Sequence, residues 1–371
     1  MRLATFNVEN MFERPAAMNL PTLKDGEPFI EDYYRLLKLI GKQQYSNADK
    51  EQMLDIMKRN KGLLTVDKSD YIRLRVIRGK FLKKARGGPV EIIANGRGDW
   101  IGWFELVPDI IKETAIENTG RVIRDVNADV FCFVEVEDRI ALNHFNSTVI
   151  PKVHGKEYDH VMLIDGNDDR GIDVGIMTRK QFDIETIASH VDDMDANGVI
   201  FSRDCPEYKI NTPSGNTLLV LINHFKSKGH GSQTENNNKR ERQAKKVRDI
   251  YETHLNQGLE YIAVAGDLND TPDSDPLRPL LGNGSTLTDI MKHNKFKDDG
   301  HPGTYANGSK SQKIDYILMS PQLSNKVKEG GIERHGVWGG EHGTLFPHYQ
   351  EIKEEKDAAS DHASLWLDFD L

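Results

Sequence analysis

Polar side chains that can bind a cation or move a proton recur where apolar, strand-like runs of this sequence end. They are two amides, four carboxylates and two imidazoles: Asn7, Glu135, His224, Asp267, Asn269, Asp315, Asp361 and His362, in TFNVEN, FVEVED, INHFKS, GDLND, KIDYILM and SDHASLW. Taken singly, each has a structural interpretation, because a strand-end Asp or Asn is most often a turn former or cap. Taken together, hard oxygen ligands and histidines without a cysteine favour a site for Mg²⁺ or Mn²⁺ over a site for zinc.

Strand-like runs and a few helices must bring these residues together. Residues 128–136 are almost continuously apolar, which predicts a strand covered on both faces. Residues 109–127 repeat apolar side chains on one helical face, and residues 238–255 predict a second helix capped by Asn237 or Asn238. Many strands with long connections predict an α/β architecture of two packed sheets with helices outside. Further strands are expected at 2–8, 158–164, 172–178, 217–225, 261–268, 313–319 and 360–371.

Composition limits the class of protein. The chain has 371 residues and a formal net charge of −9, which gives no indication of general affinity for nucleic acid. No apolar run approaches the ~20 residues of a membrane helix. The opening MRLATFNVEN indicates a strand rather than a signal peptide, which favours the cytoplasm, with secretion as the alternative if a signal had been removed. Two cysteines, Cys132 and Cys205, argue against a disulfide framework. No stable protein partner is inferred.

One segment, residues 14–108, does not follow this pattern and predicts an insertion between the first strand and the first core helix. Between residues 71 and 90 it contains seven cations and no acid, a local reversal of sign in an acidic chain. One interpretation is the solvated face of a strand and turn. The other is a surface on which Arg73, Arg75 and Arg78 contact nucleic-acid phosphates.

Aromatic residues near the end of this insertion leave a similar choice. Trp100, Trp103 and Phe104 lie within five residues of one another. They predict either a small apolar core or stacking platforms for bases.

The segments TFNVEN, EVED, NHFKSK, GDLND, IDYILM and SDHASLW together resemble the endonuclease/exonuclease/phosphatase superfamily, which includes DNase I-like nucleases, abasic-site endonucleases, inositol polyphosphate 5-phosphatases and neutral sphingomyelinases. They follow the family's order and span residues 2–371 apart from the insertion, and NHFKSKG is also similar to bacterial secreted nucleases of this superfamily. The resemblance implies a DNase I-like four-layer α/β sandwich, with two mixed β-sheets face to face and helices outside. It implies a single domain over residues 1–371, with the insertion as a subdomain at about 14–108.

The resemblance also implies roles for the matching residues. Glu135 looks like the principal metal carboxylate, with Asn7 and Asp361 close to the same ion. Asp267 looks like the residue that orients or deprotonates the attacking water, and Asn269 looks like a phosphate-oxygen donor beside it. A divalent cation and such donors would offset the negative charge that develops on the phosphoryl oxygens.

Two histidines complete the implied site. His362 looks like the histidine that contacts the scissile phosphate, polarised by Asp315, because a nearby carboxylate raises a histidine's pKa. His224 matches the second histidine of the DNase I-like members, which helps protonate the leaving oxygen.

A looser match concerns the segment NDDRGIDVGI. Arg170 and Asp173 fall where family members often place a phosphate contact and a histidine-orienting acid. Asp168 or Asp169 are alternatives for that acid.

The segment that follows His224, KSKGHGSQTENNNKRERQ, is rich in glycine and asparagine, which predicts a mobile loop. It offers Lys226 and Lys228 beside the expected site. A phosphate contact and a plain solvated loop are both open interpretations.

The hypothesis favoured by these motifs is a Mg²⁺- or Mn²⁺-dependent phosphodiesterase, a nuclease that hydrolyses DNA or RNA by in-line attack of water. The alternative keeps the chemistry and changes the substrate to an inositol phosphate, a nucleotide or a lipid headgroup, because the net negative charge and the large insertion leave this open. A third hypothesis is a non-catalytic scaffold of the same fold, which the filled motif positions disfavour.

Overall fold

The structure is a computed structural model that describes residues 1–20, 23–84, 88–168, 170–229 and 231–371. The chain divides into two compact units. The main unit is Met1–Phe12 with Ile111–Leu371, and the insertion unit is Glu13–Ile110. All six motifs that resemble the superfamily lie in the main unit, and the basic stretch lies in the insertion unit.

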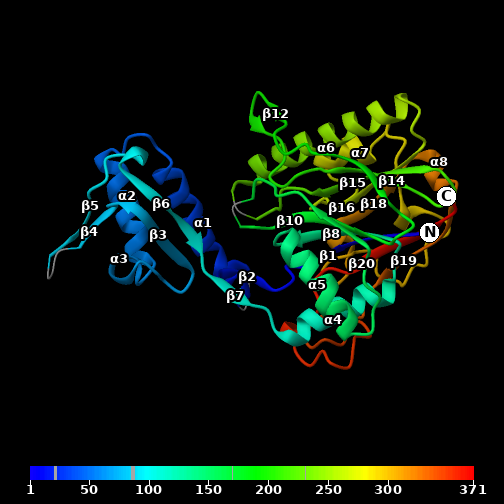
Figure 1. Cartoon of the computed structure of the whole chain (residues 1–371), viewed down its shortest axis with the longest axis horizontal. Helices are drawn as coiled ribbons and strands as arrows, with labels where there is room; N and C mark the ends of the chain where they lie inside the picture. The colour runs from blue at the N-terminus through cyan, green and yellow to red at the C-terminus, as the bar shows by residue number, and fades with distance from the viewer. Residues whose placement is uncertain (21–22, 85–87, 169, 230) are drawn as a thin grey trace. The chain divides into compact units, whose positions relative to one another are not determined.

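Two mixed six-stranded sheets form the main unit (Figure 1). Pairing is parallel between β1 and β8 and between β15 and β16, and antiparallel between the other neighbours. The first sheet has the order β19 (Val327–Glu333), β20 (Ser364–Phe369), β1 (Arg2–Asn7), β8 (Val130–Val136), β10 (Asp173–Thr178) and β9 (His160–Leu163). The second has the order β11 (Ile184–Ala188), β14 (Glu207–Asn211), β15 (Thr217–His224), β16 (Tyr261–Asp267), β18 (Asp315–Met319) and β17 (Thr288–Asp289).

Helices cover both sheets. The first sheet packs against α4 (Glu113–Val126) and α5 (Arg139–Lys152), and the second against α6 (Gln233–Asn256) and α7 (Arg278–Leu281). The smaller elements are the pair β12 (Met194–Asp195) and β13 (Gly198–Val199), α8 (Pro321–Ser324), and the 3₁₀ turns η3 (Asp275–Leu277), η4 (Ile290–Lys292), η5 (Lys310–Gln312) and η6 (Glu355–Asp357).

The alternation of side chains along each strand produces the layers. In β8, Cys132 joins the core between the two sheets, whereas its neighbour Phe133 packs with residues of α4 and α5. In β15, Val220 joins the same central core, whereas Leu221 packs with residues of α6. Continuously apolar strands are therefore required, because both faces of each sheet are covered. The predicted four-layer α/β sandwich is confirmed.

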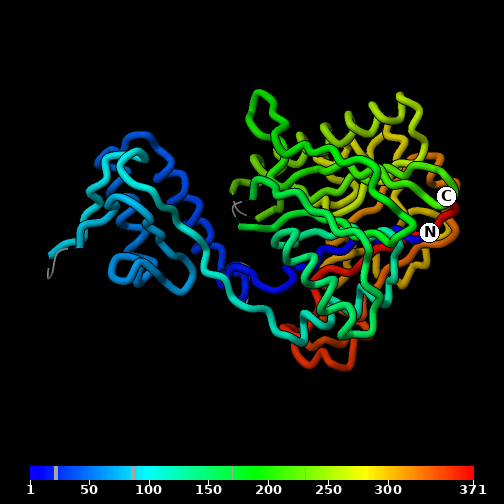
Figure 2. Tube along the Cα trace, in the orientation of Figure 1, coloured from blue at the N-terminus to red at the C-terminus, as the bar shows by residue number. Residues whose placement is uncertain are grey.

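The first and last strands lie side by side, so the two chain ends meet at one place in the main unit (Figure 2). β1 pairs with β20 antiparallel, with Thr5 opposite Leu365. This register brings Asn7, at the end of β1, next to His362, just before β20 begins. Two segments separated by the whole chain thus contribute to one site.

The helix expected at 238–255 begins earlier than predicted. Ser232 caps α6 by accepting a hydrogen bond from the N–H of Glu235, whose side chain accepts one from the N–H of Ser232. This capping box places Asn237 and Asn238 inside the helix, so the predicted cap at either asparagine was wrong. The segment after His224 that was predicted to be a mobile loop therefore ends at Ser232, because α6 begins at Gln233.

The insertion unit has an apolar core of its own, to which Trp100 and Phe104 belong. Trp103 is exposed, so of the three aromatic residues it is the one that a base could reach. The elements are β2 (Glu13–Pro15), η1 (Ala16–Asn19), α1 (Leu23–Ile40), α2 (Asn47–Arg59), α3 (Leu63–Val66), β3 (Ile72–Gly79), β4 (Leu82–Lys84), β5 (Val90–Ile92), η2 (Arg97–Asp99), β6 (Trp100–Leu106) and β7 (Pro108–Ile110). Within the described parts of the chain, no helix has the length and apolar character needed to cross a bilayer.

Candidate active site

The strand ends gather the polar residues at one edge of the two sheets. β15 and β16 are parallel, and His224 and Asp267 are cross-strand partners at their carboxyl ends. β18 runs antiparallel to β16, which places its first residue, Asp315, opposite Asp267. Because parallel strands end at the same edge of a sheet, three side chains that are far apart in sequence become neighbours.

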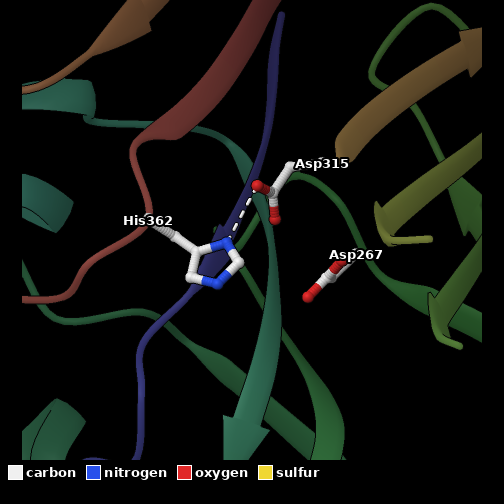
Figure 3. A group of neighbouring side chains, drawn as sticks. All are labelled: Asp267, Asp315 and His362. Carbon is white, nitrogen blue, oxygen red and sulfur yellow. Dashed lines mark hydrogen bonds and ion pairs between the residues drawn. The ribbon is translucent and has the colours of Figure 1, made fainter. Parts of the chain in front are cut away.

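His362 and Asp315 form a buried dyad, and Figure 3 shows both side chains pointing toward the space that Asp267 also faces. Nδ1 of His362 lies 2.9 Å from Oδ2 of Asp315. Thr304 donates its hydroxyl to the same Oδ2 at 2.6 Å. Burial opposes protonation of His362, but the charge and hydrogen bond of Asp315 outweigh it and hold the pKa of His362 well above its usual value. The imidazolium form is favoured at neutral pH, and its Nε2 lies 3.5 Å from Nδ2 of Asn7.

Asp267 is fully enclosed and carries several hydrogen bonds. Its Oδ1 accepts from the N–H of Asn269 at 2.8 Å, and its Oδ2 accepts from the amides of Asn269 and Asn7 at 3.2 and 3.3 Å. Burial, followed by the charge of Asp315, raises the pKa of Asp267 to about 8. Asn269 also donates to the carbonyl of Phe225 at 3.1 Å, so its amide holds Asp267 against the end of β15.

A β-bulge presents Glu135. β10 pairs Val174 with Val134 and Asp173 with Val136, so Glu135 is the extra residue of β8. It has φ 63°, a left-handed conformation that costs a non-glycine residue about 1–3 kcal/mol. Bulges of this kind re-aim a side chain. Here the bulge brings Oε1 of Glu135 to 3.5 Å from Nε2 of His224.

His224 is buried, and its environment favours the neutral ring. Burial, then the charges of Arg203 and Arg170, lower its pKa well below the usual value. Its Nε2 lies 3.5 Å from Glu135 and 3.9 Å from Oδ2 of Asp267. Its Nδ1 has no hydrogen-bond partner within the described part of the chain, so neither Asp168 nor Asp173 orients this ring.

Asp361 approaches the dyad from the other side. Its Oδ1 lies 3.7 Å from Nε2 of His362, and Tyr305 stacks at a tilt on the same imidazole with 4.8 Å between ring centroids. Asp361, then burial, then Glu9 raise the pKa of Tyr305. Tyr305 and Thr304 were not anticipated from the sequence. They are adjacent residues in a loop, and the only feature of the sequence that could have indicated their place near the site is that the loop comes shortly before KIDYILM.

The expected phosphate contact Arg170 belongs to a buried ion cluster. Its Nε donates to Oδ1 of Asp168 at 2.9 Å, and Nε of Arg203 lies 3.0 Å from Oδ2 of the same carboxylate. Burial opposes ionisation of Asp168, but the two guanidinium groups outweigh it and lower its pKa. Arg203, only 2% exposed, was missed because nothing in RDCPEY distinguishes it from a loop residue.

Asp173, expected as a substrate contact or an orienting acid, is buried at the start of β10. Its Oδ1 accepts from the N–H of Gly166 at 2.8 Å, so this carboxylate fastens the preceding loop. Burial raises the pKa of Asp173 to about 7. The alternative Asp169 lies outside the described residues.

Helix α6 supports the loop after His224 with a row of polar side chains, called here the α6 cradle: Asn236, Arg240 and Gln243. Gln243 accepts from the N–H of Lys226 at 2.9 Å, and Arg240 donates to the carbonyl of Lys226 at 2.9 Å. Asn236 donates to the carbonyl of Lys228 at 3.0 Å. Arg240 is fully buried and also donates to Asp270, next to Asn269, at 3.0 Å. The cradle therefore ties together the ends of β15 and β16.

Lys226 points its amine at its own loop, donating to the carbonyl of Gly229 at 2.6 Å. Burial, then the charge of Arg170, lowers its pKa to about 8. Arg73, Arg75 and Arg78, also expected as substrate contacts, belong to the insertion unit.

The chemistry of the donors fits a hard divalent cation. Asn7, Glu135 and Asp361, the ligands that the resemblance implies, would offer oxygen atoms, and both cysteines are buried in apolar cores. Ligand atoms of Asp267, Asp315 and His362 lie within 4.8 Å of one another, but His362 and Asp315 already satisfy each other. Burial and the charge of Asp315 favour the protonated form of Asp267, and the charge of His362 opposes them only in part. A bound Mg²⁺ or Mn²⁺ would favour the carboxylate form.

Solved structures with a similar fold are known. A mannosyl-6-phosphatase of Bacteroides thetaiotaomicron VPI-5482 has a TM-score of 0.50 at 16% identity, covering 70% of this chain and 92% of that one. An endonuclease/exonuclease/phosphatase of Bacteroides vulgatus has a TM-score of 0.48 at 20% identity, covering 69% and 90%. Truncated TDP2 of Caenorhabditis elegans has a TM-score of 0.48 at 17% identity, covering 70% and 90%. At these identities the first likeness supports the fold alone.

Sequence comparison supplies the family. The search of curated proteins found no match. Residues 112–362 match the family model described as Endonuclease/Exonuclease/phosphatase family, a segment of more than half the chain that ends at the dyad histidine. The resemblance noted from the motifs is thereby confirmed: the chain belongs to the endonuclease/exonuclease/phosphatase family of phosphoester hydrolases.

Proposed function

We propose that this protein is a Mg²⁺- or Mn²⁺-dependent phosphodiesterase that cleaves nucleic acid. The observation that carries the proposal is that the hydrogen-bonded His362–Asp315 pair and the buried carboxyl group of Asp267 face one space. A base for the attacking water and a cationic donor to the phosphoryl oxygens both assist hydrolysis of a phosphoester. Held by Asn7, Glu135 and Asp361, the cation would neutralise negative charge on the phosphoryl oxygens.

The residues then have separate tasks. In the ionised form, which a bound cation would favour, Asp267 accepts a proton from the attacking water, and the two amides that donate to it fix the direction of its oxygens. The imidazolium of His362 donates from Nε2 to a phosphoryl oxygen as negative charge grows there. Water's oxygen bonds to phosphorus as the opposite P–O bond breaks, and the leaving oxygen takes a proton from solvent.

We propose a narrower role for His224 than the one that the resemblance implies. Its lowered pKa favours a neutral ring, which can donate one hydrogen bond but holds no extra proton to transfer. We assign it to stabilising the leaving oxygen by hydrogen bonding. Asn269 is assigned to orienting Asp267, because its amide already donates to that carboxylate and to Phe225.

Nucleic acid is favoured as the substrate because one segment of this acidic chain is strongly basic. The insertion unit carries the seven cations of residues 71–90, with no acid among them. A polymer presents phosphates on both sides of the scissile one, whereas a small phosphoester does not.

The test is hydrolysis of plasmid DNA, single-stranded DNA, RNA and a panel of phosphomonoesters by purified protein with Mg²⁺, Mn²⁺ or EDTA. Nucleic-acid cleavage that EDTA abolishes, and that the His362→Ala variant lacks, is the expected result. Phosphate release from small esters without cleavage of any polymer would overturn the substrate assignment. Inertness on every substrate would overturn the catalytic proposal as well.

A further inference from the structure

The paired strands β3 and β6 of the insertion unit have one covered face. Ile72, Leu74, Trp100 and Phe104 point into the unit's core, where residues of α1 and α2 pack against them. Because successive side chains of a strand point to opposite sides, the residues between them form an open face. This open face, called the ribbon face, consists of Arg73, Arg75, Arg78, Ile101, Trp103 and Glu105.

The register sets cations beside apolar groups on the ribbon face. Arg75 is directly opposite Trp103, and Arg78 is opposite Ile101. The register shifts between Val76 and Arg78, which leaves Ile77 as an extra residue and keeps Arg78 in line with Arg75. The face therefore presents a row of guanidinium groups on one strand and an indole on the other.

Glu105 organises this arrangement. Its carboxylate accepts from Arg73 at 3.3 Å, from Arg75 at 2.9 Å and from the indole N–H of Trp103 at 3.1 Å. One carboxylate thus fixes two guanidinium groups and the aromatic ring side by side. Arg78 and Lys80 are exposed and have no side-chain ion pair with any described residue, so the face keeps a net positive charge.

The apolar residues on this face are unusually accessible. Trp103 is 42% exposed and Ile101 51%, and the extra residue Ile77 beside them is 67% exposed. A strand face that only had to be solvated would not need an indole and an isoleucine among its cations. Proteins that bind single-stranded nucleic acid combine cations that follow the phosphates with aromatic rings on which bases stack.

We propose that the ribbon face binds single-stranded nucleic acid, with Trp103 stacking on an unpaired base while Arg73, Arg75 and Arg78 contact flanking phosphates. A duplex is less suited, because its bases are already stacked on one another and offer no face to the indole. The proposal rests on the proposed function, in which nucleic acid is the substrate, and gives the insertion unit the task of holding the strand.

Binding is tested with the full-length protein carrying His362→Ala, which prevents cleavage, and a fluorescein-labelled single-stranded 20-mer. Anisotropy gives Kd over a series of salt concentrations. In this background, Arg75→Glu with Arg78→Glu is expected to raise Kd at least tenfold. The slope of log Kd against log salt should fall by about 0.7 for each cation removed. Trp103→Ala should also raise Kd about tenfold, and Trp103→Phe should keep most of the affinity.

The matched control is Arg35→Glu with Lys58→Glu, which makes the same change of charge on α1 and α2 in the same unit. It is expected to change Kd less than twofold. Equal weakening by the control, or unchanged binding by both ribbon-face variants with native circular dichroism, would overturn the proposal. So would binding to vesicles containing phosphatidylserine in place of the oligonucleotide.

The two proposals can fail separately. If the wild type cleaves nucleic acid but the ribbon-face variants bind as well as it does, only the proposal for the ribbon face is overturned. If those variants lose binding but the wild type hydrolyses only small phosphoesters, the substrate assignment is overturned and the proposal for the ribbon face is retained.

Discussion

Nδ1 of His362 lies 2.9 Å from Oδ2 of Asp315, and this contact joins the start of β20 in one sheet to the start of β18 in the other. The dyad is therefore an inter-sheet contact inside the sandwich. Thr304 adds a third partner, since its hydroxyl donates to the same oxygen at 2.6 Å. The ring is left with Nε2 facing the site, where a phosphoryl oxygen would bind.

Substitution of Asp315 by asparagine should change the pH dependence of the reaction. The pKa of His362 is raised in the folded protein, so the imidazolium is present below that pKa and lost as the pH rises through it. Asp315→Asn removes the charge that raises it, so the alkaline limb of kcat/KM should move to lower pH. Asp298→Asn, an exposed acid in the loop leading to Thr304, is the matched control and should leave the limb in place. A fall in rate without movement of the limb would mean that Asp315 only positions the ring.

We expect each of the variants Glu135→Ala, Asp267→Ala and His362→Ala to have a kcat lower by a factor of at least about 10²–10³. Each substitution removes one group that acts on the transition state. The rate is measured with saturating Mg²⁺, and far-ultraviolet circular dichroism checks that the fold is retained. Near wild-type turnover by any one variant would show that its residue has a different role.

Much of the site was accessible from the sequence because strand ends carry strong local signals. Asn7, Glu135, His224 and Asp267 each follow an apolar run, and the fold gathers the carboxyl ends of parallel strands at one edge. The layered arrangement of sheets and helices could be predicted in the same way, because continuously apolar strands need to be covered on both faces.

Other residues gave no such signal, because their importance depends on contacts between distant segments. Thr304 and Arg203 lie in loops, where sequence alone does not say which side chain will be enclosed. The polar residues of α6 look like those of a solvated helix until the loop after His224 packs on them. The bulge at Glu135 was equally hidden, because it depends on how β10 pairs with β8.

The α6 cradle should matter for catalysis although it lies behind the site. Arg240→Met removes hydrogen bonds to the carbonyl of Lys226 and to Asp270, and leaves Asp270 with Lys228 as its partner. Loss of one member of a buried ion pair lowers the free energy of unfolding by about 3 kcal/mol. We also expect kcat to fall about tenfold with little change in KM, because the ends of β15 and β16 lose their shared anchor.

The control for this prediction is Lys245→Met on the same helix, which breaks an exposed pair with Glu241. Denaturant unfolding should show a change below about 0.5 kcal/mol. If both variants lose the same stability, or if Arg240→Met keeps the wild-type kcat, the cradle does not position the site.

Metal binding should be visible in stability as well as in rate. A cation that binds only the folded state at a hundred times its Kd adds about 2.7 kcal/mol, so Mg²⁺ should raise the Tm and EDTA should reverse the increase. Glu135→Gln should abolish the increase, because it removes the carboxylate that the bulge aims at His224. Glu185→Gln, an exposed glutamate of β11, should preserve it. Without metal, Glu135→Gln should be at least as stable as the wild type, since it removes charge beside the partly uncompensated Asp267. A Tm increase that survives Glu135→Gln would place the cation elsewhere.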